Sequence, residues 1–225
     1  MRYFISDIHI QHRLMLRTRG YESFEAMHDD IVKRWNSKVT KGDTVYIIGD
    51  VSFGDYEQTK AVLDRLNGQK ILIKGNHDRY NKRKMRTSEF LKMGFKDVMD
   101  EDIIKIYDDK TGQKVDFYLK HYPYSWHPLK EWWQRLRKKA VHRSYNQLYP
   151  KYTEMWLIHG HHHGGDEVHD NEINVSWETV GGVPVCETKI LEIRRKQLDK
   201  PRWMRYIERI IGRTLNGAVD YHEDY

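Results

Sequence analysis

Long apolar runs are missing from this sequence, and cysteine is almost missing. No stretch approaches the roughly 20 apolar residues that a transmembrane helix needs, and the mean hydropathy is −0.85. The first residues, MRYFISDIHI, lack the layout of a signal peptide and are typical of a first strand. Cys186 is the single cysteine, which excludes an internal disulfide framework and suits a reducing compartment. We therefore expect a cytoplasmic protein with no membrane span; the composition leaves its oligomeric state open.

Negative charge is scarcer than positive charge. The chain has 33 Asp and Glu against 39 Lys and Arg, which gives a formal net charge of +6. This balance permits a phosphate-bearing or nucleic-acid partner without requiring one. With 225 residues, the chain is long enough for one sizeable core with an appendage.

Short β-rich runs bounded by glycine or polar turn residues predict buried strands. The first three runs are separated by two segments with helical spacing. One is 23–39, with Ser23 as its N-cap, and the other is 55–69, where we expect Gly68 to be the C-cap. The order β-α-β-α-β predicts α/β layering at the front of the chain. Beyond Leu91 the expected strands are 95–107, 114–121, 154–159, 172–178 and 183–193.

Two segments interrupt or follow this pattern. Residues 124–150 form a basic, aromatic, helix-like insertion, and we assign them to a domain that spans 1–197. Residues 198–225 follow as a C-terminal helix with an acidic tail. Pro201 fits the start of this helix, and the apolar residues after it recur at helical spacing.

Residues of the kind that bind metals recur at the ends of five separate strand-like runs. In layered α/β folds the carboxyl ends of strands line the functional crevice, so we expect these side chains to meet. They offer three oxygen ligands and four imidazoles and no thiolate, which is too many for one tetrahedral ion and suits two divalent ions that share a carboxylate. The set consists of Asp7, His9, Asp50, Asn76, His121, His161 and His163.

Five short motifs carry these residues. In chain order they are D-x-H from Asp7 to His9, G-D-x-x-x-G from Gly49 to Gly54, G-N-H-D from Gly75 to Asp78, His121 before Tyr-Pro, and G-H-x-H from Gly160 to His163. Their order and spacing resemble the calcineurin-like metallophosphoesterases over residues 1–195. The resemblance implies a four-layer α/β/β/α sandwich, an α/β fold with the insertion and the C-terminal helix as additions.

The resemblance also implies a role for each residue. One metal is held by Asp7, His9, Asp50 and His163, and the other by Asp50, Asn76, His121 and His161. A metal-bridging hydroxide attacks phosphorus in line. His77 stabilises the transition state or protonates the leaving oxygen, and Asp78 orients it. Mn²⁺ is the expected ion, although Fe, Zn and Ni also accept such ligands.

Departures from the family pattern narrow the substrate. The stretch GDVSFGD lacks the Asp and the Arg-Gly that protein phosphatases of the superfamily carry there, so we do not expect a protein phosphatase. The first loop resembles a small bacterial and phage subgroup of predicted phosphohydrolases.

The basic residues of this first loop are His12, Arg13, Arg17 and Arg19. They form either a phosphate clamp, since arginine forks bind phosphate oxygens in pairs, or a solvated basic loop. His162, next to the ligand histidines, is expected to face the substrate.

The insertion mixes tryptophans with lysines and arginines. Trp126, Trp132 and Trp133 would stack on bases while the cations hold a phosphate backbone, which predicts a lid for a nucleotide or a single-stranded nucleic acid. Alternatively, the tryptophans pack against the sandwich. We expect a dimetal phosphodiesterase acting on a nucleotide or nucleic-acid-type phosphate ester. The alternatives are a phosphomonoesterase and a non-catalytic binding module.

Overall fold

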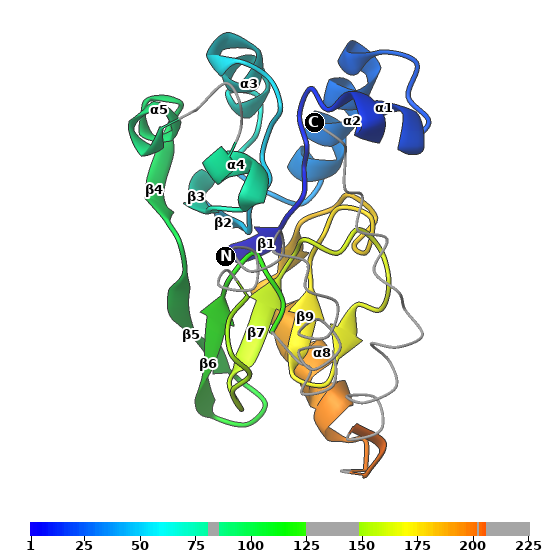
Figure 1. The fold of residues 1–225 in the computed structure, drawn as a ribbon. Coiled ribbons are helices and arrows are strands. Elements are labelled where there is room, and N and C mark those ends of the chain that lie inside the picture. The colour runs from blue at the N-terminus through cyan, green and yellow to red at the C-terminus, as the bar shows by residue number, and fades with distance from the viewer. Residues whose placement is uncertain (81–85, 125–148, 202, 206–225) are drawn as a thin grey trace, which may run out of the picture.

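Two five-stranded sheets lie face to face in the computed structural model, with helices against them (Figure 1). The model describes residues 1–80, 86–124, 149–201 and 203–205. The α/β sandwich expected from the sequence is confirmed. The predicted insertion at 124–150 and the acidic tail lie almost wholly outside the described residues.

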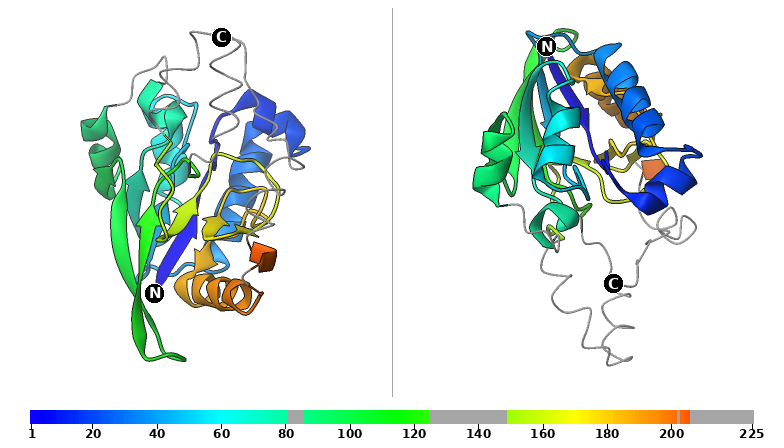
Figure 2. Two further views of the ribbon diagram at one scale, coloured as in Figure 1. Left: turned by 60° about the horizontal axis from the view of Figure 1, so that its bottom comes forward. Right: turned by 90° about the horizontal axis from the view of Figure 1, so that it is seen from above.

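The first sheet is mostly parallel and has the order β10-β1-β2-β3-β4. Its strands are β1 (Arg2–Ile5), β2 (Thr44–Ile47), β3 (Gln69–Ile73), β4 (Phe95–Met99) and the antiparallel β10 (Val185–Cys186). The helices that connect its parallel strands are α1 (Arg13–Thr18), α2 (Phe24–Asn36), α3 (Tyr56–Leu63), α4 (Asn76–Tyr80) and α5 (Thr87–Lys92). Figure 2 shows α2, α3 and α5 along one face of this sheet.

The capping residues predicted for the two long helices behave differently. The side chain of Ser23 accepts from the backbone N–H of Ala26 at 3.1 Å, so it caps α2 as expected. The start of α3 is a capping box between Asp55 and Gln58. Gly68 is not the C-cap of α3, because the helix already ends at Leu63; its φ of 83° serves the turn into β3 instead.

The second sheet has the order β5-β6-β7-β9-β8. Its strands are β5 (Asp102–Asp108), β6 (Gln113–Leu119), β7 (Trp156–His159), β8 (Val168–His169) and β9 (Glu172–Asn174). Alternating apolar residues of both sheets fill the space between them, for example Phe4 and Ile48 from the first sheet and Phe117 and Ile158 from the second. A separate core joins the other face of the first sheet to its helices.

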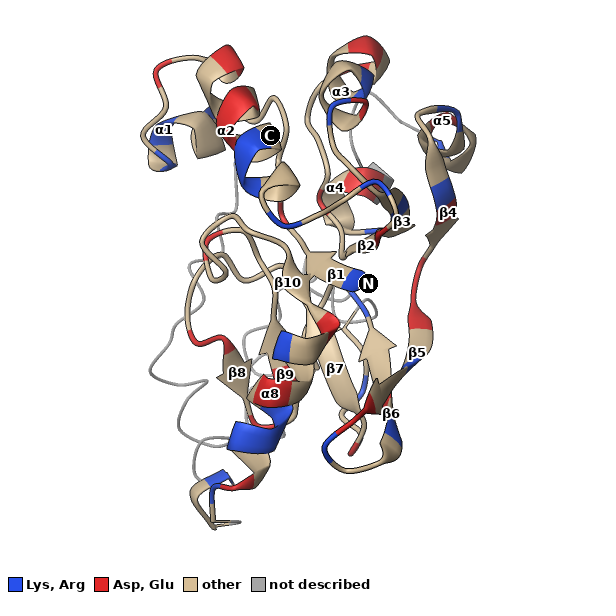
Figure 3. Cartoon of the chain, turned by 180° about the vertical axis from the view of Figure 1, so that it is seen from behind, with Lys and Arg blue, Asp and Glu red and all other residues tan. Residues whose placement is uncertain are grey.

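The strand predicted over 183–193 is wrong for most of its length. Only β10 is a strand, and the chain continues directly into the helix α8 (Glu187–Leu198). Ile190, Leu191 and Ile193 are buried in the core between the sheets, so the β-branched composition reflects burial rather than strand geometry. Charged residues of both signs cover the rest of α8 (Figure 3). A helical turn at 203–205 follows Pro201.

The carboxyl ends of β1, β2, β3, β6 and β7 meet at one edge of the sandwich. There the chain after β1 is fastened to the chain after β2: the N–H of Asp7 donates to the carbonyl of Gly49 at 3.0 Å, and the N–H of His9 donates to that of Asp50 at 3.1 Å. This is the edge at which the sequence places the ligand-type residues. Among the described helices, none is long and apolar enough to cross a membrane.

Candidate metal centre

Four of the predicted ligands have a backbone conformation that is uncommon outside glycine. The φ angles of Asp7, His9, Asp50 and His161 are 57°, 54°, 57° and 70°. Left-handed φ values in non-glycine residues cost free energy and collect at functional sites, where the surrounding structure enforces them. The backbone at the strand ends is therefore shaped to aim these side chains at one point.

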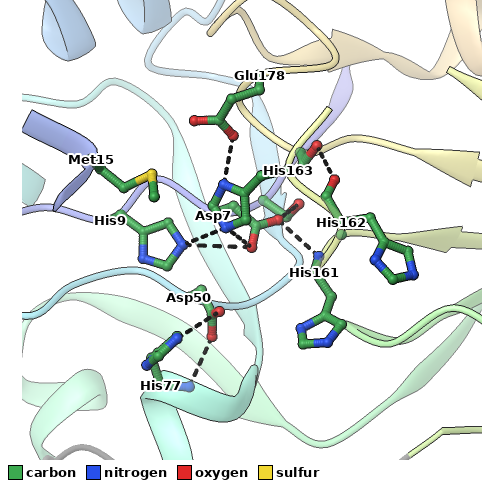
Figure 4. Close-up of polar contacts among 12 residues, drawn as sticks. Asp7, His9, Met15, Asp50, His77, His161, His162, His163 and Glu178 are labelled. Carbon is green, nitrogen blue, oxygen red and sulfur yellow. Dashed lines mark hydrogen bonds and ion pairs between the residues drawn. The ribbon is translucent and has the colours of Figure 1, made fainter. Parts of the chain in front are cut away.

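Asp7, His9 and His163 form the first group (Figure 4). The two Nε2 atoms of His9 and His163 lie 3.0 Å apart, and Oδ1 of Asp7 lies 3.7 Å from the first and 3.5 Å from the second. Oδ1 of Asp7 is buried and has no hydrogen-bond partner among the described residues. A buried oxygen of this kind needs an explanation, and a bound cation supplies one.

Asp50, Asn76, His121 and His161 form the second group. Oδ2 of Asp50 lies 3.3 Å from Nε2 of His121. Oδ1 of Asn76 lies 3.0 Å from that same nitrogen and 3.1 Å from Nδ1 of His161. Ligand atoms of Asp7, Asp50 and His121 all lie within 4.8 Å of one another, so the two groups adjoin. Asn76 places a neutral oxygen in this group.

The nitrogens that face away from the centre are held by protein groups. Nδ1 of His121 lies 2.7 Å from the carbonyl of Ile48, and Nδ1 of His163 lies 2.8 Å from Oε2 of Glu178. In both rings Nδ1–H is therefore the donor, which leaves the lone pair of Nε2 toward the centre. Metal-binding histidines usually have such a partner, which fixes the ring and its tautomer.

His161 is held in the opposite sense. Its Nε2 lies 2.9 Å from the hydroxyl of Tyr149, and its Nδ1 faces Asn76. Tyr149 also packs on Tyr122, with ring centroids 5.0 Å apart. The residue at the end of the predicted insertion thus fixes the ring of a predicted ligand.

Glycines allow the strand ends to approach closely. A Cβ on Gly49 would overlap Nδ1 of His121, and a Cβ on Gly160 would overlap Oδ2 of Asp7. Side chains at these positions would push two ligand residues out of place.

Buried charge gives the centre an affinity for cations. Burial acts to raise the pKa of Asp50, but the adjacent His121 outweighs it and holds that pKa below its ordinary range. Burial likewise opposes ionisation of Asp7, and His163 with the other histidines holds its pKa low. Two ionised carboxylates in a buried site need positive charge next to them. The donor set, the buried Asp7 oxygen and this charge all fit two divalent ions.

His77 lies at the open side of the centre. Its backbone N–H donates to Oδ1 of Asp50 at 3.0 Å, and its ring Nε2 lies 3.9 Å from Oδ2 of the same residue. The ring rests on Phe53, with centroids 4.4 Å apart, and its side chain is 23% exposed. His77 therefore borders the second group and is partly open to solvent.

Asp78 contacts backbone rather than the ring of His77. Its carboxylate accepts N–H groups from Gly75 at 2.8 Å, Asp50 at 2.7 Å and Val51 at 3.0 Å. These three bonds tie the G-N-H-D loop to the G-D loop. The described bonds thus give Asp78 a role in holding two loops together, which differs from the expected orientation of His77.

The predicted basic cluster separates into different environments. His12 is buried, accepts the N–H of Met15 at 3.1 Å as N-cap of α1, and packs on His9 with centroids 5.1 Å apart. Arg13 and Arg17 are exposed on α1, and the described contacts do not join them to the ligand residues.

Arg19 does not act as a phosphate clamp. It is buried and donates to the carbonyls of Asp7 and Ile8 and to Glu178, so its guanidinium is already occupied.

The ring of His162 lies on the side of Figure 4 away from His9 and His163. Its centroid is 6.4 Å from that of His159. It is 5.5 Å from the centroid of the predicted ligand His161, and the carbonyl of His162 accepts from the side chain of Ser176 at 2.9 Å, which fastens the loop. The expected contact of His162 with substrate stays a prediction.

A family model described as calcineurin-like phosphoesterase matches residues 3–186. The chain belongs to the calcineurin-like phosphoesterase family. It is a metal-dependent hydrolase that acts on phosphoric esters, as the motifs predicted.

The phosphoesterase has relatives in archaea, phages and bacteria. It is 28% identical over 205 residues to the protein MJ1445 of Methanocaldococcus jannaschii, and the aligned region covers 86% of this chain and 91% of that protein. It is 34% identical over 134 residues to the gene 66 protein of Mycobacterium phage L5, which covers 54% and 63% respectively. The crystal structure of AQ665 from Aquifex aeolicus, described as a protein of unknown function, matches with a TM-score of 0.56 and 25% identity over 86% of this chain and 98% of that one.

Proposed function

We propose that this phosphoesterase is a dimetal phosphodiesterase that hydrolyses a nucleotide or nucleic-acid-type phosphate ester. The observation that carries the proposal is the pair of adjoining ligand groups, one around the buried Oδ1 of Asp7 and one around Oδ2 of Asp50. Each group offers carboxylate, imidazole or amide donors, and Asp50 lies where both could use it.

The metals would be held by residues of both groups. Asp7, His9 and His163 hold one ion, Asn76, His121 and His161 hold the other, and Asp50 joins them. When bound, two divalent ions supply the activation of water and the neutralisation of charge on the phosphoryl oxygens. This donor set suits Mn²⁺ first, and also Fe, Zn and Ni, because it has nitrogen and oxygen donors and no thiolate.

The side chains of His77 and Asp78 supply the remaining contributions, which are proton donation and positioning. The backbone N–H of His77 is anchored by Asp50 and its ring is supported by Phe53, and that ring donates a hydrogen bond to a phosphoryl oxygen or a proton to the leaving oxygen. Asp78 holds the loop of His77 against the loop of Asp50. Both actions depend on groups fixed before substrate arrives, which is how positioned hydrogen bonds lower a barrier.

The choice of substrate class rests on charge and composition. The net charge of +6 favours an anionic substrate. The insertion at 124–150 combines tryptophans with cations, a combination that suits stacked bases and a phosphate backbone. Arg13 and Arg17, exposed on α1, would add positive charge for a second phosphate. A single cysteine fits an enzyme of a reducing compartment such as the cytoplasm.

The test compares two chromogenic esters. Metal-stripped protein is assayed on bis-p-nitrophenyl phosphate and on p-nitrophenyl phosphate, with and without Mn²⁺. Asp50→Asn removes the shared carboxylate, and Asp64→Asn serves as a matched control because Asp64 is an exposed residue at the end of α3. We expect Mn²⁺-dependent cleavage of the diester that Asp50→Asn abolishes and Asp64→Asn retains.

The other outcomes are also informative. Cleavage of the monoester alone would contradict the diesterase proposal and favour a nucleotide or small-molecule phosphatase. Activity that survives in Asp50→Asn would contradict the assignment of the centre. Inactivity of the metal-loaded protein on both esters and on short single-stranded oligonucleotides would contradict catalysis on this substrate class.

A further inference from the structure

A buried arginine lies directly behind the D-x-H loop. The side chain of Arg19 is only 6% exposed and follows the last turn of α1. Its Nη1 donates to the carbonyl of Ile8 at 2.7 Å, and its Nη2 donates to that of Asp7 at 2.8 Å. These are the carbonyls of the segment in which Asp7 and His9 have left-handed φ values. Arg19 therefore holds the strained segment that aims two ligand residues.

The same guanidinium reaches a carboxylate from the far end of the chain. Nε and Nη2 of Arg19 lie 2.8 Å and 2.7 Å from Oε1 of Glu178, and the guanidinium rests over the ring of Trp177, 4.9 Å from its centroid. The other oxygen, Oε2, accepts from Nδ1 of His163 at 2.8 Å. One arginine thus joins the first loop, residues 177–178 and a ligand histidine.

We infer that Arg19 and Glu178 are positioning residues that set the metal affinity of the Asp7–His9–His163 group. The inference rests on the proposed function, since it assumes that this group binds a metal ion. Arg19 fixes the backbone that carries Asp7 and His9, and Glu178 fixes the tautomer of His163. The second group has supports of its own, Ile48 for His121 and Tyr149 for His161, and the described contacts of Arg19 and Glu178 reach none of its side chains.

The two oxygens of Glu178 bind different partners, Oε1 to Arg19 and Oε2 to His163, so replacing one oxygen by an NH₂ group has a specific effect. Glutamine at this position would be nearly isosteric, but its oxygen would have to face the two donors of Arg19. Its NH₂ group would then face Nδ1 of His163, which could only accept. The ring proton would move to Nε2, the atom that faces Asp7, and a protonated Nε2 cannot bind a metal.

The experiment titrates metal-stripped full-length protein with Mn²⁺ by calorimetry. The variants are Glu178→Gln and Arg19→Lys. The controls are Asp30→Asn and Arg34→Lys, a second arginine–carboxylate pair: Nε of Arg34 lies 2.6 Å from Oδ2 of Asp30, and its Nη1 donates to the carbonyl of Gly181 at 2.9 Å. The control pair therefore anchors a helix to the same part of the chain without contacting a predicted ligand.

We expect wild type to bind two Mn²⁺ ions. Glu178→Gln and Arg19→Lys should weaken one of the two binding events by about 10–100-fold, the usual effect of losing a partner of a metal-binding histidine. The other event should keep its wild-type affinity, and both controls should titrate like wild type. Urea unfolding with EDTA present checks that each variant folds, and Arg19→Lys still tests the inference if Glu178→Gln does not fold.

Two results would overturn the inference and leave the proposed function standing. One is wild-type affinity at both sites in Glu178→Gln and Arg19→Lys. The other is an equal loss at both sites, which would show that the pair does not act on the first group in particular. Wild-type protein that binds fewer than two Mn²⁺ ions would instead contradict the proposed function itself.

Discussion

Gly75 offers the most direct way to move the central carboxylate without touching a ligand. A Cβ at this position would overlap Oδ1 of Asp50 and lie 2.8 Å from its backbone N and 2.9 Å from its Cγ, whereas ordinary contacts begin at 3.4 Å. The backbone of Asp50 cannot withdraw, because the carboxylate of Asp78 binds the N–H groups of both Gly75 and Asp50. In Gly75→Ala the side chain of Asp50 must therefore turn away.

The size of the effect follows from this crowding. Cγ of Asp50 has to move by about 0.5 Å and Oδ1 by more, while metal ligands tolerate only about 0.2 Å. We expect hydrolysis by Gly75→Ala to fall by about 100-fold, the scale of a misplaced catalytic group. Overpacking of this kind should also lower the free energy of unfolding by about 1–3 kcal/mol.

Gly42→Ala is the matched control. A Cβ on Gly42 meets nothing within 4 Å, so we expect unchanged hydrolysis and a free energy of unfolding that is unchanged or raised by about 0.4–1 kcal/mol. Both variants are compared with wild type by diester hydrolysis with Mn²⁺ and by urea unfolding with EDTA present. Wild-type hydrolysis in Gly75→Ala would refute the claim that the position of Asp50 controls the reaction.

Three further changes test other parts of the structure. Asp43 accepts the N-terminal ammonium at 2.8 Å, and this bond with those from Thr40 lowers its pKa to about 2. A carboxylate whose folded pKa is lowered stabilises the fold above its unfolded pKa, so Asp43→Asn should be less stable than wild type at pH 7. Urea unfolding should show this difference in stability shrinking as the pH falls from about 4 toward 2. Asp78→Asn keeps one acceptor oxygen but turns an NH₂ group toward at least one of the three backbone donors, so it should cost about 1–3 kcal/mol, measured by the same method with EDTA. Equal stability would contradict the contacts described. Tyr149→Phe removes the partner of His161 and should weaken one Mn²⁺ site by about 10-fold in calorimetry, and unchanged binding would contradict that role.

The position of the ligand residues could be predicted from the sequence because strand ends obey a simple rule. Parallel strands β1, β2 and β3 finish at one edge, so residues that follow each of them meet whatever the details of the fold. Asp7, Asp50 and Asn76 illustrate this, and His121 and His161 reach the same edge from β6 and β7. The order of the motifs was therefore sufficient to predict that these residues lie at one edge of the sandwich.

Other features depend on tertiary contacts that no local pattern contains. Arg19 and Glu178 are 159 residues apart, and nothing in the spacing of either predicts that they bind each other. The basic surroundings of Arg19 left a phosphate clamp and a solvated loop open, whereas in the structure its donors bind the carbonyls of Asp7 and Ile8 and the carboxylate of Glu178. The strand prediction around Ile190 and Ile193 was wrong for a different reason. A short apolar run fits a buried strand and a buried helix equally well.

Diffraction from crystals grown with Mn²⁺, recorded at the manganese absorption edge, tests the central claim most directly. The account predicts two anomalous peaks about 3.5–4 Å apart, one beside Asp7, His9 and His163 and one beside Asn76, His121 and His161. Asp50 should lie between them. A single peak, or peaks away from these residues, would contradict the dimetal centre.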